Sequence, residues 1–126
     1  MAKQTLNTQN APAAIGPYSQ AVKVGNLIFT SGQLPINTQS GELIADIEGA
    51  TKQSLDNVKA ILESSGASMD TIVKTVVFLR DMKDFAAMNT VYATYFPSNP
   101  PARSAFQVAQ LPKDAIVEIE AIAIAE

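Results

Sequence analysis

The sequence of 126 residues contains no cysteine, no histidine and no tryptophan. Without thiol and imidazole groups, the chain cannot form a disulfide, a thiol nucleophile, a Ser-His-Asp triad or a His/Cys zinc site. It also has no phosphate-binding P-loop, no GxGxxG pattern and no cluster of metal ligands in its sequence. We therefore expect a protein that works with neither a cofactor nor a bound metal ion.

Positive charge is also scarce. Nine Lys and Arg residues stand against twelve Asp and Glu residues, which gives a formal net charge of −3 at pH 7. The two arginines are Arg80 and Arg103, and the seven lysines are scattered along the chain. Proteins that bind nucleic acids normally carry a basic stripe or patch. Nucleic acid is therefore not expected as a partner.

Long hydrophobic runs are missing as well. No run approaches the ~20 apolar residues that are needed to span a bilayer, and the polar residues 1–10 do not resemble a secretory signal. Hydrophobic residues nevertheless make up 47 % of the chain and charged residues 17 %, which argues against intrinsic disorder. We expect a soluble, cytoplasmic protein without a membrane contact, with residues 1–126 forming a single domain.

Hydrophobic periodicity and turn residues predict the order ββαβαββ. Gly25-Asn26 between two apolar runs is typical of a tight hairpin turn. Gly66 and Pro97 mark the ends of two segments with helical spacing. The predicted strands are Ala21–Val24, Leu27–Ser31, Ile72–Leu79, Ser104–Ala109 and Ala115–Ile124, and the predicted helices are approximately Gly49–Ser65 and Lys83–Phe96.

This order of elements favours the α+β class, with two helices on one face of a mixed sheet. The last predicted strand is hydrophobic on both sides, because its odd positions from Ala115 to Ala123 are all apolar and its even positions include isoleucines. Two helices are too few to cover both faces of the sheet. We therefore expect a second subunit to cover the other face in a homo-oligomer.

Glu118 and Glu120 are the clearest chemical signal in the last strand. Side chains alternate along a strand, so these two carboxylates lie on the same face, between isoleucines. A carboxylate in apolar surroundings is costly unless it is paired or hydrogen-bonded. Two interpretations remain open at this point: a general base or acid with a raised pKa, or two glutamates that reach water at the rim of the sheet.

Arg103 follows a loop with three prolines, and its planar guanidinium group matches a carboxylate in two-point hydrogen bonding. The alternative is a structural salt bridge to a loop or terminus, which residue pattern alone slightly favours. Tyr18, Ser31 and Asn89 are polar side chains at the ends of predicted elements, and each could contact a ligand or satisfy the backbone. Gly32 would allow close approach of the backbone to a ligand.

Several stretches of the sequence strongly resemble the RidA (YjgF) family. Together they span nearly the whole chain in the order expected for this family. The C-terminal signature corresponds to Pro101–Ser104, Val108-Ala109, Leu111-Pro112 and Val117–Ala121, and the N-terminal segment corresponds to Asn10–Tyr18. Further matches are Thr30–Gln33, Gln53–Val58 and Val73–Thr75.

The resemblance implies a chorismate-mutase-like fold that assembles as a homotrimer with sites at the subunit interfaces. The implied activity is hydrolysis of 2-enamine and 2-imine acids, such as 2-aminoacrylate and 2-iminobutanoate, to 2-keto acids and ammonia. In the implied site, Arg103 holds the substrate carboxylate and Glu118 directs water to the imine carbon. The resemblance places Tyr18, Ser31, Gly32 and Asn89 in the lining of the pocket.

Ala105 is a departure from this family, because many members have cysteine at the corresponding position. The backbone N–H of Ala105 could still donate a hydrogen bond to the substrate. The missing thiol leaves a second hypothesis open, in which the protein is a non-catalytic regulatory trimer that binds a small carboxylate. A ribonuclease activity has also been attached to parts of this family, and it finds no support in the charge balance.

Overall fold

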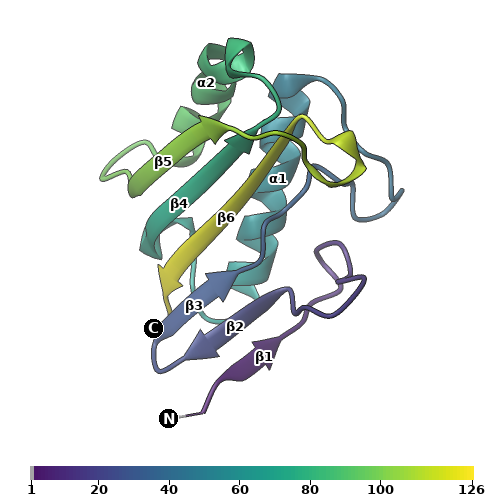
Figure 1. Cartoon of the computed structure of the whole chain (residues 1–126). Helices are drawn as coiled ribbons and strands as arrows, with labels where there is room; N and C mark the ends of the chain where they lie inside the picture. The colour runs from purple at the N-terminus through teal and green to yellow at the C-terminus, as the bar shows by residue number, and fades with distance from the viewer. Residues whose placement is uncertain (1) are drawn as a thin grey trace.

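The structure is a computed structural model that describes residues 2–126. It contains a six-stranded mixed sheet with the strand order β1-β2-β3-β6-β4-β5 and two α-helices (Figure 1). Only β4 and β5 run parallel to each other. The elements are β1 (Gln4–Leu6), β2 (Ala21–Val24), β3 (Leu27–Thr30), α1 (Ile47–Glu63), η1 (Met69–Thr71), β4 (Ile72–Leu79), η2 (Met82–Asp84), α2 (Phe85–Tyr95), β5 (Ala102–Gln107), η3 (Pro112–Asp114) and β6 (Val117–Ile124).

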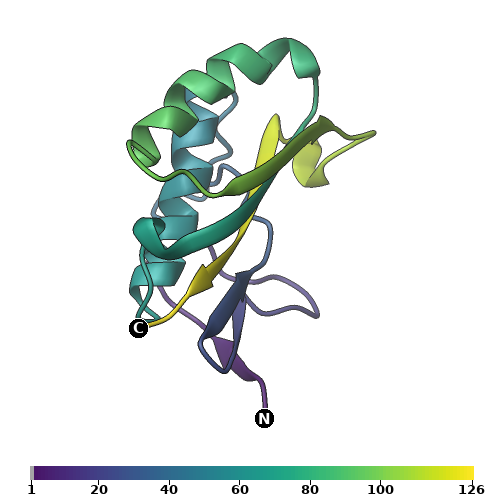
Figure 2. The same ribbon diagram turned by 90° about the vertical axis from the view of Figure 1, so that its left-hand side faces the viewer.

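Both helices lie on the same side of the sheet, and the predicted α+β class is confirmed (Figure 2). The predicted hairpin at Gly25-Asn26 is also present, with Val24 paired to Leu27 and a positive φ of 59° at Gly25. Glycine adopts this conformation without the steric cost that a Cβ atom would add. The local turn chemistry therefore sets the register of β2 and β3.

The predicted boundaries of α1 were wrong by two residues at each end. The helix begins at Ile47 because the Asp46 side chain caps it, accepting a 2.8 Å hydrogen bond from the Gly49 N–H through Oδ2. Glycine near the start of the pattern suggested the later boundary. Past the other end, Gly66 has the positive φ of 84° that is typical of a residue following a helix.

Other differences concern short or exposed elements. The first turn of the second predicted helix is the 3-10 segment η2, and Asp81 accepts from the Lys83 N–H there, so α2 itself begins at Phe85. β5 begins two residues earlier than predicted, because its parallel pairing with β4 starts at Ala102 opposite Lys74. The three-residue strand β1 was not predicted at all, since it is a short edge strand with exposed side chains.

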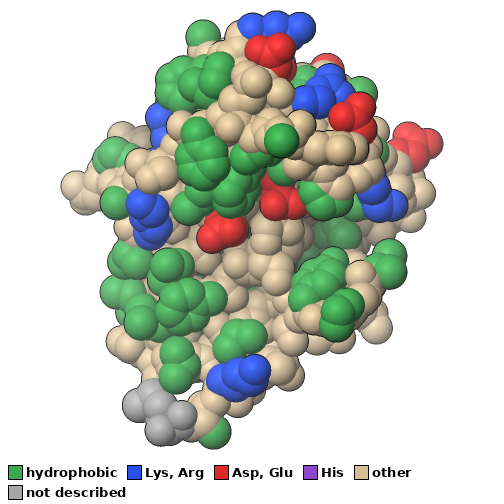
Figure 3. Space-filling view, viewed as in Figure 1, with side chains coloured by type: hydrophobic (Ala, Val, Ile, Leu, Met, Phe, Trp, Pro, Cys, Tyr) green, Lys and Arg blue, Asp and Glu red, His purple; other side chains and the backbone are tan. Residues whose placement is uncertain are grey.

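The two faces of β6 differ sharply. Its odd-numbered side chains pack beneath the helices, and Val117, Ile119 and Ala123 are fully buried. The opposite surface of the described sheet, which we call the open face, is not covered by an α-helix (Figure 2). Hydrophobic groups and acidic side chains are mixed on it (Figure 3). The register of the sheet assigns to it Phe29, Val76, Phe78, Ser104, Phe106, Glu118, Glu120, Ile122 and Ile124.

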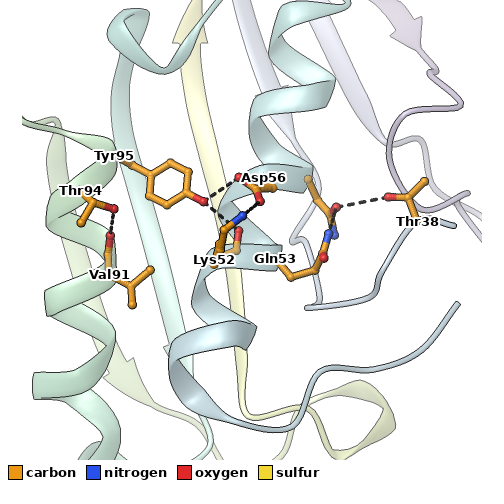
Figure 4. A network of polar contacts seen from close by, with 8 residues as sticks. Thr38, Lys52, Gln53, Asp56, Val91, Thr94 and Tyr95 are labelled. Atoms are coloured by element: carbon orange, nitrogen blue, oxygen red, sulfur yellow. Dashed lines mark hydrogen bonds and ion pairs between the residues drawn. The ribbon is translucent and has the colours of Figure 1, made fainter. Parts of the chain in front are cut away.

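Polar contacts tie the two helices together (Figure 4). The Tyr95 hydroxyl of α2 donates a 2.6 Å hydrogen bond to the Asp56 carboxylate of α1, and the Lys52 ammonium lies 2.8 Å from the same carboxylate. Burial and the neighbouring Asp56 raise the pKa of Tyr95, so its hydroxyl keeps its proton. Within residues 2–126, neither helix has the length and apolar character that crossing a membrane requires.

Ser54 on α1 generates a prediction about stability. Its hydroxyl is buried, and within the described part of the chain it has no hydrogen-bond partner. Ser54→Ala removes an unsatisfied polar group and improves helix propensity, so we expect the free energy of unfolding to rise by about 1 kcal/mol. Urea denaturation at one fixed protein concentration measures this change.

Thr75→Val is the matched control for this experiment. The buried Thr75 hydroxyl lies 2.6 Å from the Tyr92 hydroxyl, and its removal leaves that partner unsatisfied. We expect a loss of about 1–3 kcal/mol in this variant. A destabilised Ser54→Ala protein would show that the serine hydroxyl has a partner.

Candidate active site

A cavity of about 600 Å³ lies between the loop before β2, the segment that follows β3 and the turn before β6. Four of the residues predicted from the sequence line it, namely Tyr18, Ser31, Gly32 and Glu118. We refer to this space as the Glu118 cavity. The structure therefore brings together residues that are separated by up to 100 positions in the chain.

Gly32 and Glu118 are in close contact within this cavity. The segment after β3 runs beside β6, because the Gln33 N–H donates to the Ile119 carbonyl and the Ile119 N–H donates back to Gln33. A Cβ atom on Gly32 would lie 2.5 Å from Oε2 of Glu118, which is closer than such atoms can approach. Glycine at position 32 thus makes room for the carboxylate.

The surroundings of Glu118 disfavour its charged form. Its side chain is half-buried, on the same face of β6 as Glu120. Burial raises the pKa of Glu118 above its ordinary value of 4.5, and the nearby Glu120 charge raises it further. A carboxyl group in this setting can exchange protons closer to neutral pH than an ordinary glutamate can.

Ser31 and Tyr18 stand at different depths in the cavity wall. The Ser31 hydroxyl donates a 2.6 Å hydrogen bond to the Ser19 carbonyl, so the hydroxyl proton is already engaged and its oxygen lone pairs remain. The Tyr18 side chain is 52 % exposed, and its oxygen accepts a 3.4 Å hydrogen bond from the Ile15 N–H. The phenol of Tyr18 therefore retains its own O–H for a ligand.

Two buried amide side chains hold the walls of this cavity. Gln20 accepts from the Thr8 N–H and donates to carbonyls of the 8–12 segment, including Pro12 at 2.8 Å. On the opposite side, the Asn57 amide of α1 donates to the carbonyls of Leu34 and Ile36. Buried amides with satisfied hydrogen bonds fix the backbone around them. Sequence reasoning did not find either residue, because a single Gln or Asn carries no local signal.

Arg103 lies elsewhere, on the edge strand β5. Its side chain points to the helix side of the sheet, where Nη1 donates a 2.6 Å hydrogen bond to the Asn89 side-chain oxygen. The guanidinium carbon lies 4.7 Å from the centre of the Tyr92 ring and 5.5 Å from that of Phe85. Cation–π contacts of this kind orient an arginine and leave its remaining N–H donors available.

No ion pair to Arg103 occurs among residues 2–126, so the salt-bridge interpretation of this arginine has no counterpart in the chain as described. The aromatic rings of Phe85 and Tyr92 flank the guanidinium group. Their spacing with Asn89, at positions i, i+4 and i+7 of α2, places all three on one side of the helix. That spacing was the signal available in the sequence.

Ala105 lies on the same side of β5 as Arg103 and packs partly against the core. The Val108 N–H bonds to the Leu79 carbonyl of β4. Because N–H groups alternate in direction along a strand, the Ala105 N–H points away from β4, toward the free edge of the sheet. A main-chain donor is thus present beside Arg103.

The structure does not bring Arg103 and Glu118 together within one chain. Arg103 pairs with Thr75 and faces α2, whereas Glu118 pairs with Phe78 and faces the opposite side of the sheet. The site residues predicted from the sequence thus form two groups. One lies at the β5 edge and contains Arg103, Asn89 and Ala105, and the other lies around the Glu118 cavity. Among residues 2–126, no group of three carboxylates is arranged so that it could hold a metal ion.

Comparison with known proteins gives the family of the chain. A family model described as endoribonuclease L-PSP matches residues 8–125. The chain belongs to this family, the RidA (YjgF) family. A RutC family protein of Pyrococcus abyssi is 53 % identical over 127 residues, covering 100 % of both chains.

Two further RidA relatives carry more specific descriptions. A protein of Escherichia coli K12 named 2-iminobutanoate/2-iminopropanoate deaminase is 53 % identical over 124 residues, covering 96 % of this chain and 97 % of its own. The crystal structure of E. coli TdcF with bound serine superposes with a TM-score of 0.94 at 48 % identity, covering 98 % and 99 % of the two chains. The fold predicted from the resemblance is thereby confirmed.

The environment of Glu118 predicts how stability depends on pH. The folded chain holds the Glu118 proton more tightly than the unfolded chain, so its contribution to stability is lost as pH rises from about 4.5 through the raised pKa. Glu118→Gln removes this loss. We expect a higher urea midpoint than that of the parent protein at pH 7, and no such gain at pH 4.

Glu63→Gln is the control for net charge, because it removes the same charge from the exposed end of α1. A gain of equal size in both variants at pH 7 would contradict the prediction, since it would trace the effect to overall charge and not to the cavity.

Proposed function

We propose that this protein hydrolyses small 2-imino acids, and their 2-enamine tautomers, to 2-keto acids and ammonia. The observation that carries the proposal is the 53 % identity with an E. coli protein named 2-iminobutanoate/2-iminopropanoate deaminase, over nearly the full length of both chains. This reaction needs a group that binds the substrate carboxylate and a group that exchanges protons, and Arg103 and Glu118 have these properties.

The catalytic site in this proposal lies between two copies of the chain. One copy contributes the edge of β5 with Arg103, Asn89 and the Ala105 N–H, and the next contributes the Glu118 cavity. Two observations support this division. The two groups face opposite sides of one sheet, and the open face exposes large hydrophobic side chains, including Phe29, Phe106 and Ile124. Such a surface is typical of a subunit interface.

A head-to-tail arrangement follows from this division, because different surfaces of each copy meet. Such contacts close into a ring with one identical site per interface. The resemblance to the RidA family implies that this ring contains three copies of the chain. β5 forms one edge of the sheet, and the 11–18 loop lies near the opposite edge, beside β1 and β2 (Figure 1). This placement suits contacts that pass from each copy to the next.

Arg103 recognises the substrate in this mechanism. Its guanidinium group is already oriented by Asn89 and Tyr92, so little conformational freedom is lost when it binds the substrate carboxylate. The Ala105 N–H donates a second hydrogen bond to the same carboxylate. The E. coli relative solved with bound serine carries a small amino acid, which has the α-carboxylate that such a site requires.

Glu118 activates water in this mechanism. Its carboxylate takes a proton from a water molecule while the water oxygen bonds to the protonated imine carbon, which gives a tetrahedral amino alcohol. The protonated Glu118 then returns its proton to nitrogen, the C–N bond breaks as the carbonyl forms, and the hydroxyl proton leaves with the departing ammonia as ammonium, which releases the keto acid and restores the Glu118 carboxylate. The protonated imine is electrophilic by itself, so no covalent nucleophile is needed, and proton transfer contributes about 10²–10⁴-fold to the rate.

A rate assay tests the activity directly. A pyridoxal-phosphate dehydratase acting on serine generates 2-aminoacrylate in situ, and the release of pyruvate is followed with and without the protein. We expect acceleration by the parent protein, a fall of about 10²-fold or more for Glu118→Gln, and a higher KM for Arg103→Ala. Calorimetric binding of pyruvate without any acceleration would contradict the proposal and favour the regulatory alternative.

A mixing experiment tests whether the site is shared. At substrate concentrations well below KM, Arg103→Ala and Glu118→Gln chains are each expected to be strongly impaired, but a mixed ring contains interfaces where an intact Arg103 meets an intact Glu118. Random assembly from equal amounts places both intact residues at about a quarter of the interfaces. Co-expressed chains are therefore expected to recover about a quarter of the parent activity.

The control mixture combines Arg103→Ala with the double variant Arg103→Ala/Glu118→Gln. No chain in this mixture has Arg103, so the mixture should show no recovery of activity. Absence of recovery in the first mixture, with mixed rings verified by mass spectrometry, would show that both residues act from the same chain.

A further inference from the structure

The turn before β6 has an unusual backbone. Lys113 has φ and ψ angles of 58° and 19°, and Asp114 follows with a φ of 55°. Two consecutive residues other than glycine in the left-handed region are rare, because each Cβ atom is crowded against the backbone. Strained residues of this kind persist where the surrounding structure enforces them, and they cluster at functional sites.

Arg80 enforces this turn. Its Nη1 donates a 3.0 Å hydrogen bond to the Asp114 carbonyl and lies 3.4 Å from the Asp114 carboxylate. The Arg80 N–H donates to the Ile116 carbonyl, and the Asp114 N–H donates to the Leu111 carbonyl. With these contacts at both ends, the conformation of Lys113 is fixed by the fold.

The left-handed conformation of this turn places Lys113 beside the Glu118 cavity. Lys113 is one of the residues that line the Glu118 cavity, and the other charged residue of the lining is Glu118 itself. Within residues 2–126 the ion pairs are Lys52–Asp56 and Arg80–Asp114. Lys113 therefore forms an ion pair neither with Glu118 of the cavity nor with Asp114 of the turn. The turn therefore holds an uncompensated ammonium group at the rim of the cavity.

We propose that Lys113 is a specificity-determining residue that favours 2-imino acids with a second anionic group, as in 2-imino dicarboxylic acids. This inference rests on the proposed function. In the shared site, Arg103 of the neighbouring copy holds the α-carboxylate, and Lys113 receives the anionic end of the substrate side chain. Charge complementarity of this kind discriminates between ligands more than it strengthens binding overall.

The size of the cavity is consistent with a longer substrate. In the single chain its volume of about 600 Å³ lies within the range of pockets that hold drug-sized ligands, and part of this space is taken by the neighbouring copy in the shared site. A substrate with a longer side chain and a terminal carboxylate would fill more of this space and reach the rim. The same ammonium also offsets the repulsion between Glu118 and a dianionic ligand.

Product binding tests this inference without depending on turnover. The probes are 2-oxoglutarate and 2-oxopentanoate, which have the same five-carbon chain and differ in the terminal carboxylate. Calorimetry on the assembled protein gives the ratio of their dissociation constants. We expect the parent protein to prefer 2-oxoglutarate, and Lys113→Gln to lower this preference by about fivefold, the upper range for a solvent-exposed ion pair.

Two further variants make the result specific. Lys113→Arg keeps the positive charge and should retain the preference. Lys59→Gln removes the same charge from the outer side of α1, away from the cavity, and should leave the ratio unchanged. Because Lys113 is exposed, its substitution should not prevent folding, which circular dichroism verifies.

The outcomes separate the two proposals. If both keto acids bind and Lys113→Gln leaves their ratio unchanged, the role of Lys113 is refuted and the proposed function stands. If neither keto acid binds the parent protein, the inference is refuted together with the shared site. A preference that Lys113→Gln abolishes and Lys59→Gln preserves supports the role of Lys113.

Discussion

β6 pairs with β3 on one side and β4 on the other, and its side chains alternate between the two faces of the sheet. The odd positions complete the core beneath the helices, while the even positions place Glu118 and Glu120 on a surface without helices. One strand therefore supplies both the centre of the core and the carboxylate of the cavity. A shift of register by one residue would exchange these roles and bury two charges.

Much of the fold follows from local patterns in the sequence. The alternation along the last strand predicted both of its faces, Gly25-Asn26 predicted the hairpin, and the helical spacing of the segment that ends near Gly66 predicted α1. Exact boundaries depended on contacts that no local pattern reveals. Asp46 begins α1 earlier than expected, and the parallel pairing with β4 sets the start of β5.

The candidate site could be predicted only in part. Glu118 stood out because a carboxylate alternated with apolar residues, but its contact with Gly32 depends on the pairing of residues almost ninety positions apart. The roles of Arg103 and Asn89 came from family resemblance, and the placement of Arg103 and Glu118 on opposite sides of the sheet was not foreseen. Residue patterns predicted an apolar open face that a second copy would cover, but they did not indicate which residues would meet there. Gln20 and Asn57 escaped notice because their importance lies in backbone carbonyls that a sequence does not display.

The alanine at position 105 has a consequence for the chemical robustness of the protein. The β5 edge meets its ligand in the proposed site with a guanidinium group and a peptide N–H. The same edge has no sulfur atom that peroxides or electrophiles could modify. In the proposed site, ligand capture at this edge therefore involves no oxidisable sulfur, and proton transfer is left to a single carboxyl group, that of Glu118 on the neighbouring copy.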